Sequence, residues 1–158
     1  MSLLSFFEWC DGSALGNAIR SSTYTFPILE VFHLLGLAAI GGAVLLIDMR
    51  LFGIGLRRRP VAEIARYAQP FLAGSLLVMI VSGGLLFTSE AIKCYHHEAF
   101  WFKMISLFLA ILFTFTVHRK VTMADASRVG PVAAKLVAIV SVALWTCVGI
   151  GGRWIGFS

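Results

Sequence analysis

Four ionisable side chains lie inside long apolar stretches of this 158-residue sequence. Glu30 and His33 belong to one stretch, and Lys103 and His118 belong to another. An ionisable group in apolar surroundings is costly, and such groups often mark a binding site or a proton path. A neutral imidazole can ligate iron or another metal, and an ammonium group can bind a carboxylate. These residues are therefore the first candidates for chemistry.

The spacing of these residues decides which of them can meet. If both stretches are helices running in the same direction, His33 lies roughly 10 Å and Lys103 roughly 6 Å from their starts. The two side chains then share a layer, in which Glu30, one turn before His33, could pair with Lys103. His118 lies roughly 22 Å deeper than Lys103, so it belongs to a separate site. Asp48 stands at the inner end of the first stretch.

The sequence leaves two interpretations open for each candidate. His33 is either a haem or metal ligand or a hydrogen-bonded interior histidine. Lys103 is either a functional partner or a side chain that reaches toward the membrane surface. His96 and His97 precede the second stretch and either fold over the same layer as ligands or form a solvated pair. His118, followed by two basic residues, either ligates a metal or a second haem or marks the end of a membrane span.

Four apolar stretches must position these residues, and each is close to the roughly 20 residues that cross a bilayer as a helix. We predict membrane helices over residues 26–49, 68–88, 99–118 and 131–152, and a short interfacial helix over residues 2–20. Hydrophobic residues make up 59% of the chain and charged residues 13%, which is too few polar residues for a water-exposed surface. The prediction is an all-α, integral membrane four-helix bundle in one domain, residues 1–158.

The basic residues predict the orientation of this bundle. Most of them lie in or beside the loops after the first and third helices: Arg50, Arg57, Arg58, Arg59, Arg66, Arg119, Lys120, Arg128 and Lys135. The opposite side carries Arg20, Lys93 and Arg153. By the positive-inside rule we expect a multi-pass protein of the bacterial inner membrane with periplasmic N- and C-termini. The net charge of +5 then reflects orientation in the lipid bilayer, and we expect no nucleic acid partner.

Small residues mark the helix faces that we expect to point inward. Lys103 begins a stripe on one helical face that continues through Ser106, Ala110, Thr114 and His118. Glycines in the other helices allow close packing, leave room for a flat cofactor, or form the contact of a homo-oligomer. Cys10 and Cys94 both fall on the outer side, where they either form a disulfide or remain free.

Parts of the chain resemble known families. Residues 26–33 read FPILEVFH, residues 48–53 read DMRLFG, and residues 152–156 read GRWIG. Together they resemble a family of uncharacterised bacterial four-helix membrane proteins over nearly the whole chain. More distantly, the layout is similar to the HemJ-type protoporphyrinogen oxidase and to the membrane domain of CopD-type copper-resistance proteins.

The HemJ-type resemblance carries an expectation about a cofactor. In that family a first-helix histidine and a third-helix lysine are associated with haem b, and the corresponding residues here are His33 and Lys103. This chain has Gly41 and Gly42 in the region where that family usually has a tryptophan. The resemblance therefore implies haem binding more than oxidase activity.

Three functions follow as hypotheses. The first is a haem-b-binding membrane redox protein, an oxidoreductase or an electron carrier that serves quinone or a redox partner protein. There His33 ligates iron, and Lys103, His96 or His97 supplies the second ligand or a propionate contact. The second is a protein that handles copper or another metal. The third is an accessory subunit of a respiratory complex, in which Glu30 and Lys103 form a structural ion pair.

Overall fold

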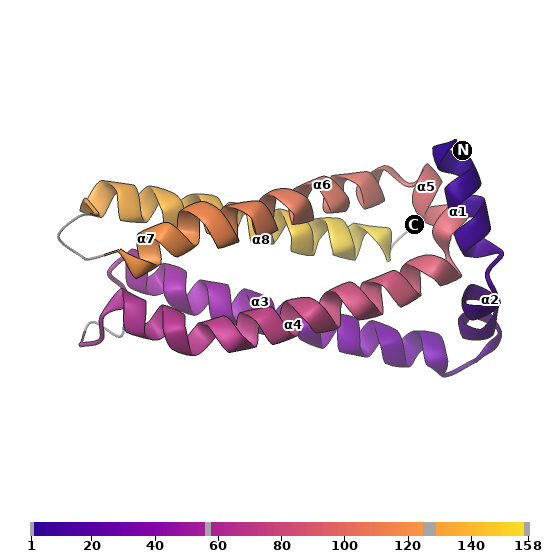
Figure 1. The fold of residues 1–158 in the computed structure, drawn as a ribbon, viewed down its shortest axis with the longest axis horizontal. Coiled ribbons are helices and arrows are strands. Elements are labelled where there is room, and N and C mark those ends of the chain that lie inside the picture. Colours follow the sequence, from indigo (N-terminus) through magenta and orange to yellow (C-terminus); the bar gives the residue numbers. More distant parts are fainter. Residues whose placement is uncertain (1, 56–57, 125–128, 157–158) are drawn as a thin grey trace.

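The computed structural model describes residues 2–55, 58–124 and 129–156, and all regular elements in these ranges are helices. The long helices are α3 (Thr25–Leu51), α4 (Val61–Ser89) and α8 (Pro131–Ile155). The remaining long segment, residues 98–123, joins three pieces: α6 (Glu98–Phe113), the π-helical η1 (Thr114–His118) and α7 (Arg119–Met123). All four segments of this described part are long and apolar enough to cross a membrane. The predicted all-α membrane bundle is confirmed (Figure 1).

Short helices lie across one end of the bundle (Figure 1). The helix predicted over residues 2–20 is in fact two helices, α1 (Leu3–Asp11) and α2 (Ala14–Ser21). The chain breaks between them because the Oγ of Ser13 accepts a hydrogen bond from the backbone nitrogen of Gly16 at 3.0 Å and so caps α2. The third short helix, α5 (Ala91–His96), packs against α1. Together these helices cover the end toward which α3 and α6 present their N-termini.

Two helices extend beyond the apolar stretches that predicted them. α4 begins after Pro60 at Val61, well before the predicted start at residue 68. The prediction began too late because it followed hydropathy, and the first turns of α4 contain charged residues. The helical chain after residue 118 likewise continues as α7 to Met123. Arg57 and Arg128, two of the basic loop residues, lie outside the described residues.

The bundle consists of two helix pairs, α3 with α4 and α6 with α8, and α8 also contacts α3 (Figure 1). The pairs meet in a buried core at mid-length: Ile40, Val44, Leu72, Met79, Ala110, Trp145 and Val148. A second core closes the end near α7 and includes Ile47, Leu51, Ile64, Ala65, Ala68 and Ala138. Because α3 and α6 run in the same direction, residues at equal depth on these helices can meet across the interior.

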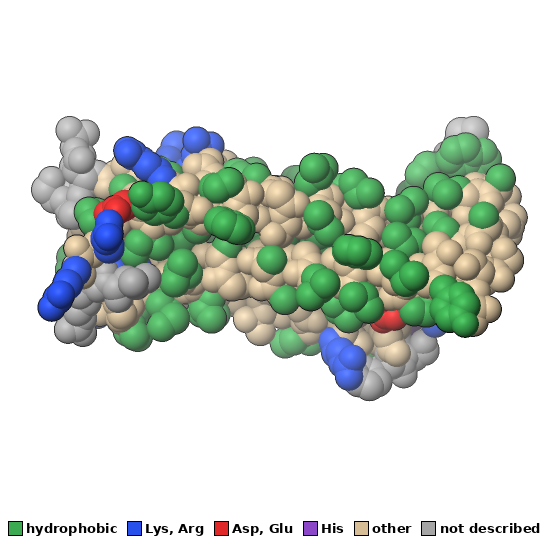
Figure 2. Space-filling view, turned by 90° about the horizontal axis from the view of Figure 1, so that it is seen from below, with side chains coloured by type: hydrophobic (Ala, Val, Ile, Leu, Met, Phe, Trp, Pro, Cys, Tyr) green, Lys and Arg blue, Asp and Glu red, His purple; other side chains and the backbone are tan. Residues whose placement is uncertain are grey.

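The outer surface of the helices is apolar, as a lipid environment requires. Figure 2 shows hydrophobic side chains along the length of one face and Lys and Arg side chains gathered mainly at one end. The exposed basic residues of that end are Arg58, Arg59, Arg66, Arg119, Lys120 and Lys135. The chain is therefore a multi-pass membrane protein.

The close approach of α6 and α8 depends on Gly151. A Cβ added there would lie 3.0 Å from the Cβ and 3.2 Å from the Cα of Lys103. We expect Gly151→Ala to lower the free energy of unfolding by about 1–3 kcal/mol, because the two helices must move apart. Gly149→Ala is the matched control, since its Cβ would meet no atom within 4 Å. Unfolding followed by circular dichroism in micelles measures the difference, and equal stability of the two variants would contradict this packing.

Candidate functional site

The structure brings His33 and Lys103 together in one layer, as their depths predict. His33 comes from α3 and Lys103 from α6, and both side chains are half-buried. The Nζ of Lys103 lies 3.4 Å from the Nε2 of His33. The contact links the two helix pairs at the end of the bundle that carries the short helices.

Ser82 on α4 fixes the hydrogen-bonding state of the His33 ring. The Ser82 hydroxyl donates its hydrogen to the carbonyl of Val78, with an O···O distance of 2.6 Å. It can therefore only accept from His33, whose Nδ1 lies 3.0 Å from the Ser82 Oγ. A neutral His33 imidazole then carries its hydrogen on Nδ1, and its Nε2 lone pair faces Lys103. Metal-ligating histidines commonly have this kind of orienting hydrogen bond on the other ring nitrogen.

Two glycines lie beside His33 and Lys103, which therefore contact helix backbone. A Cβ on Gly83 would lie 2.9 Å from the Cε1 of His33, so the ring rests directly against α4. A Cβ on Gly152 would lie 3.5 Å from the Nζ of Lys103. At these two positions the glycines allow close packing, one of the two roles predicted for them, whereas room for a flat cofactor stays a prediction.

The expected ion pair between Glu30 and Lys103 is not formed. Lys103 faces His33, and the ion pairs within the described residues do not include Glu30, whose side chain is exposed. Three residues along a helix correspond to a rotation of about 300°, roughly 60° short of a full turn, which carries Glu30 out of the contact between α3 and α6. Its proposed role near a cofactor stays a prediction.

His96, which ends α5, and His97, which precedes α6, make different contacts. His96 is exposed and its ring packs edge-on against Tyr95, with centroids 5.1 Å apart. His97 caps α6, and its Nδ1 accepts a hydrogen bond from the backbone nitrogen of Ala99 at 3.2 Å. Within the described residues, no group of three or more His, Cys, Asp and Glu side chains could hold a metal ion. The predicted role of His96 and His97 as ligands stays a prediction.

A second polar pair lies at the opposite end of the bundle. The Nε2 of His118 is 2.8 Å from the Oδ1 of Asp48, and the two residues are 3% and 0% exposed. His118 ends the π-helical segment η1, and Asp48 lies one turn before the end of α3. His118 thus belongs to a separate site, as predicted, whereas its pairing with Asp48 was not predicted. The available signal was a spacing, since Asp48 follows His33 by the same fifteen residues that separate Lys103 and His118.

The predicted inward stripe of α6 and η1 connects the two pairs. Ser106, Ala110, Thr114 and His118 are all buried, which confirms the helical face assigned from their spacing. Thr114 also accepts a hydrogen bond from the indole nitrogen of Trp145 on α8, at 3.1 Å. The interior between the pairs is otherwise filled by the apolar core, so the two polar pairs are distinct sites.

Cys10 and Cys94 are free thiols in the structure, although both belong to the apolar cluster around Phe7 and Ala91. Burial, and secondarily the charge of Glu90, raises the pKa of the Cys94 thiol to about 11. We therefore expect Cys94 to remain protonated at neutral pH and to react with iodoacetamide slowly, because only the thiolate is nucleophilic. The folded state favours the neutral thiol, so the reaction should accelerate as the pH rises from about 9 toward 11.

Mass spectrometry of alkylated peptides, at several pH values in native micelles, measures this rate for Cys94. The same peptide from protein unfolded in denaturant is the control and should react at the rate of an ordinary thiol. Equally fast alkylation of Cys94 in the folded and unfolded protein at pH 8 would contradict the burial of this thiol.

Fold and site together define a helical, multi-pass membrane protein with two polar pairs joining the same two helices. A family model matches residues 6–158, and the chain belongs to this family, the family of unknown function DUF6644. This agrees with the resemblance to an uncharacterised family of membrane proteins. No curated protein matches the chain, and no solved structure does.

Proposed function

We propose that this protein binds haem b between α3 and α6 and transfers electrons at the end of the bundle that carries both termini. The observation that carries the proposal is the orientation of His33. Its Nδ1 is tied to Ser82 and its Nε2 faces across the helix interface toward Lys103. The resemblance to the HemJ-type family, at the same two residues, supports it.

His33 and Lys103 are the residues that would hold haem b. Haem iron is commonly held by a histidine nitrogen, and the second position varies between proteins. Nε2 of His33 and Nζ of Lys103 lie 3.4 Å apart, so both residues would contact the same bound group, His33 as a ligand of the iron. Alternatively, Lys103 remains charged and binds a propionate.

The chain's own residues would then have defined tasks. Ser82 orients the His33 ring through Nδ1 and keeps Nε2 free of hydrogen. Gly83 and Gly152 have no side chain, so the His33 ring and the Lys103 side chain can lie directly against α4 and α8. Haem b, when bound, would supply one-electron transfer. The apolar core beneath this layer excludes water and separates the site from the basic end of the bundle.

The position of the site supports electron exchange with membrane quinone or with a redox partner protein. The His33–Lys103 contact lies toward the end of the bundle that carries the short helices. A site at that depth is accessible both to a carrier in the membrane and to a protein outside it. The chain would thus serve as an electron carrier or as part of an oxidoreductase.

The experiment that tests the proposal is the haem content of the protein purified from haem-replete cells. We expect about one haem b per chain, extractable by acidified acetone because no Cys-x-x-Cys-His motif is present to attach it covalently. Purification from cells unable to make haem, followed by addition of hemin, should give the same product. A colourless, folded protein that does not bind added hemin would refute haem binding.

A further inference from the structure

The Asp48–His118 pair has a structure that neither helix packing nor the proposed haem site explains. Both side chains are almost fully buried, and they meet in one short contact of 2.8 Å. The second carboxylate oxygen, Oδ2 of Asp48, has no hydrogen-bond partner within the described part of the chain. A buried carboxylate with an unsatisfied oxygen is costly, and such a cost is usually tied to function or offset by water.

The surroundings of the pair are mostly apolar. Ile47 and Leu51 flank Asp48 on α3 and belong to the buried core at this end. Among charged residues, Arg119 follows His118 directly and lines the same cavity. A separate surface group contains Arg50, which donates to the carbonyl of Arg59. Arg59 in turn forms an ion pair with Glu63. Arg66 on α4, Lys120 on α7 and Lys135 on α8 are exposed. Asp48 is therefore the carboxylate that balances a charge on His118.

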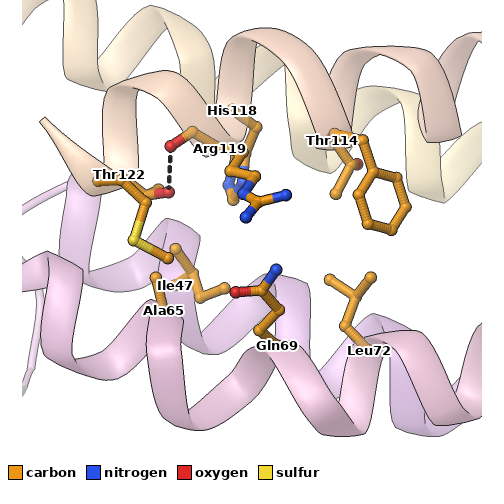
Figure 3. A pocket seen from close by; sticks show the side chains of 10 residues that line it. Ile47, Ala65, Gln69, Leu72, Thr114, His118, Arg119 and Thr122 are labelled. Carbon is orange, nitrogen blue, oxygen red and sulfur yellow. Dashed lines mark hydrogen bonds between the residues drawn. The ribbon is translucent and has the colours of Figure 1, made fainter.

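A small cavity lies beside His118. It has a volume of about 40 Å³ and lies between α4 and the η1–α7 segment, with His118 in its wall. This is enough for a water molecule, which needs roughly 10–15 Å³. Figure 3 shows Gln69 from α4 and Arg119 from the facing segment reaching into the space from opposite sides. The cavity wall thus contains both an exposed residue, Arg119, and the buried His118.

The backbone around His118 is also unusual. η1 is a π-helical turn, and such turns are rare and frequently occur at functional sites. It begins at Thr114, which also lines the cavity and accepts the hydrogen bond of Trp145. The π turn therefore sets the position of His118 between Asp48 on one side and the cavity on the other.

We infer that Asp48 and His118 form a buried proton-binding site that exchanges protons with water through this cavity. In the unloaded state, Nε2–H of a neutral His118 donates to the carboxylate of Asp48. A proton arriving from cavity water binds Nδ1 and creates the imidazolium, whose charge Asp48 balances. Release follows the reverse path, and no other bond changes. This inference does not rest on the proposed haem site.

The test is a titration of the ¹⁵N-histidine-labelled, full-length protein in lipid nanodiscs, followed by NMR of the imidazole nitrogens. His118→Gln assigns the His118 signals, and the exposed His96 serves as an internal reference in every sample. We expect Nδ1 of His118 to gain and lose a proton reversibly in the course of the titration. In Asp48→Asn, which keeps the shape of the side chain, this proton uptake should be lost. A His118 ring whose nitrogen signals stay unchanged at every pH tested would overturn the inference.

A second variant keeps the test decisive if Asp48→Asn does not fold. Ala65 is buried in the cavity wall and its side chain makes no hydrogen bond. Ala65→Leu therefore fills the cavity and leaves Asp48 and His118 unchanged. We expect it to slow the exchange of the His118 ring proton with solvent by about tenfold. Exchange at the unchanged rate would show that protons do not use the cavity, and would overturn the proposed path.

Discussion

His118→Ala is expected to lower the free energy of unfolding by about 3–5 kcal/mol, because it leaves the carboxylate of Asp48 buried without its partner. Asp48 is 0% exposed and His118 supplies its hydrogen bond at 2.8 Å. His96→Ala is the matched control, since that imidazole is exposed and its removal should change stability by no more than about 0.5 kcal/mol. Both are measured by unfolding in mixed micelles at pH 7.

The double variant Asp48→Leu/His118→Leu distinguishes two causes of the lost stability: a buried carboxylate without its partner, and the loss of side-chain packing. If the penalty of His118→Ala comes from the stranded charge, replacing both residues with apolar ones should recover most of the stability. A double variant as unstable as the sum of the single variants would instead show that shape and packing dominate. The proton-binding inference would then lose its electrostatic basis.

Gly83→Ala is expected to abolish haem binding while the bundle stays folded. The added Cβ would lie 2.9 Å from the Cε1 of His33, at the far end of a side chain that can rotate away. The rotation costs little stability, but it breaks the contact between Nδ1 of His33 and Ser82 and turns Nε2 out of the interface. We expect a loss of haem comparable to that of His33→Ala, measured as haem per chain after purification.

Gly84→Ala is the neighbouring control, because its Cβ would meet no atom within 4 Å. It should retain the haem content of the unchanged protein. If Gly83→Ala also retains its haem, then haem binding depends neither on the contact of His33 with α4 nor on its hydrogen bond to Ser82.

The large features of this fold could be predicted because they follow from solvent. An apolar stretch of about 20 residues has few alternatives to a membrane helix, so all four spans are visible in the sequence. Depth then follows from counting at a fixed rise per residue, and this placed His33 beside Lys103. The break of the N-terminal segment was harder, since it depends on the Ser13 cap and not on hydrophobicity.

The partners of the candidate residues could be predicted less well, because hydrogen bonds depend on rotation as well as depth. Ser82 in α4 resembles any serine that bonds to a preceding carbonyl, and only the packing of α3 on α4 shows that it also contacts His33. Glu30 has a suitable depth but points outward. The π-helical turn that ends at His118 has no recognisable sequence pattern, so the local position of that ring becomes visible only in the folded chain.

One signal for the inner pair is present in the sequence. Asp48 follows His33 by the same fifteen residues by which His118 follows Lys103. Two parallel helices that meet at one pair should meet again at the other, at a rise of roughly 22 Å. Counting depth along both helices therefore places Asp48 and His118 at the same level, whereas their contact also depends on the rotation of each helix.

The measurement that tests the central claim most directly is a reduced-minus-oxidised visible spectrum of the purified protein beside His33→Ala and His118→Ala. We predict a b-type α-band in the unchanged protein, its loss in His33→Ala, and its retention in the folded fraction of His118→Ala. A band that survives in His33→Ala, or that is lost only in His118→Ala, would contradict the haem site at His33 and Lys103.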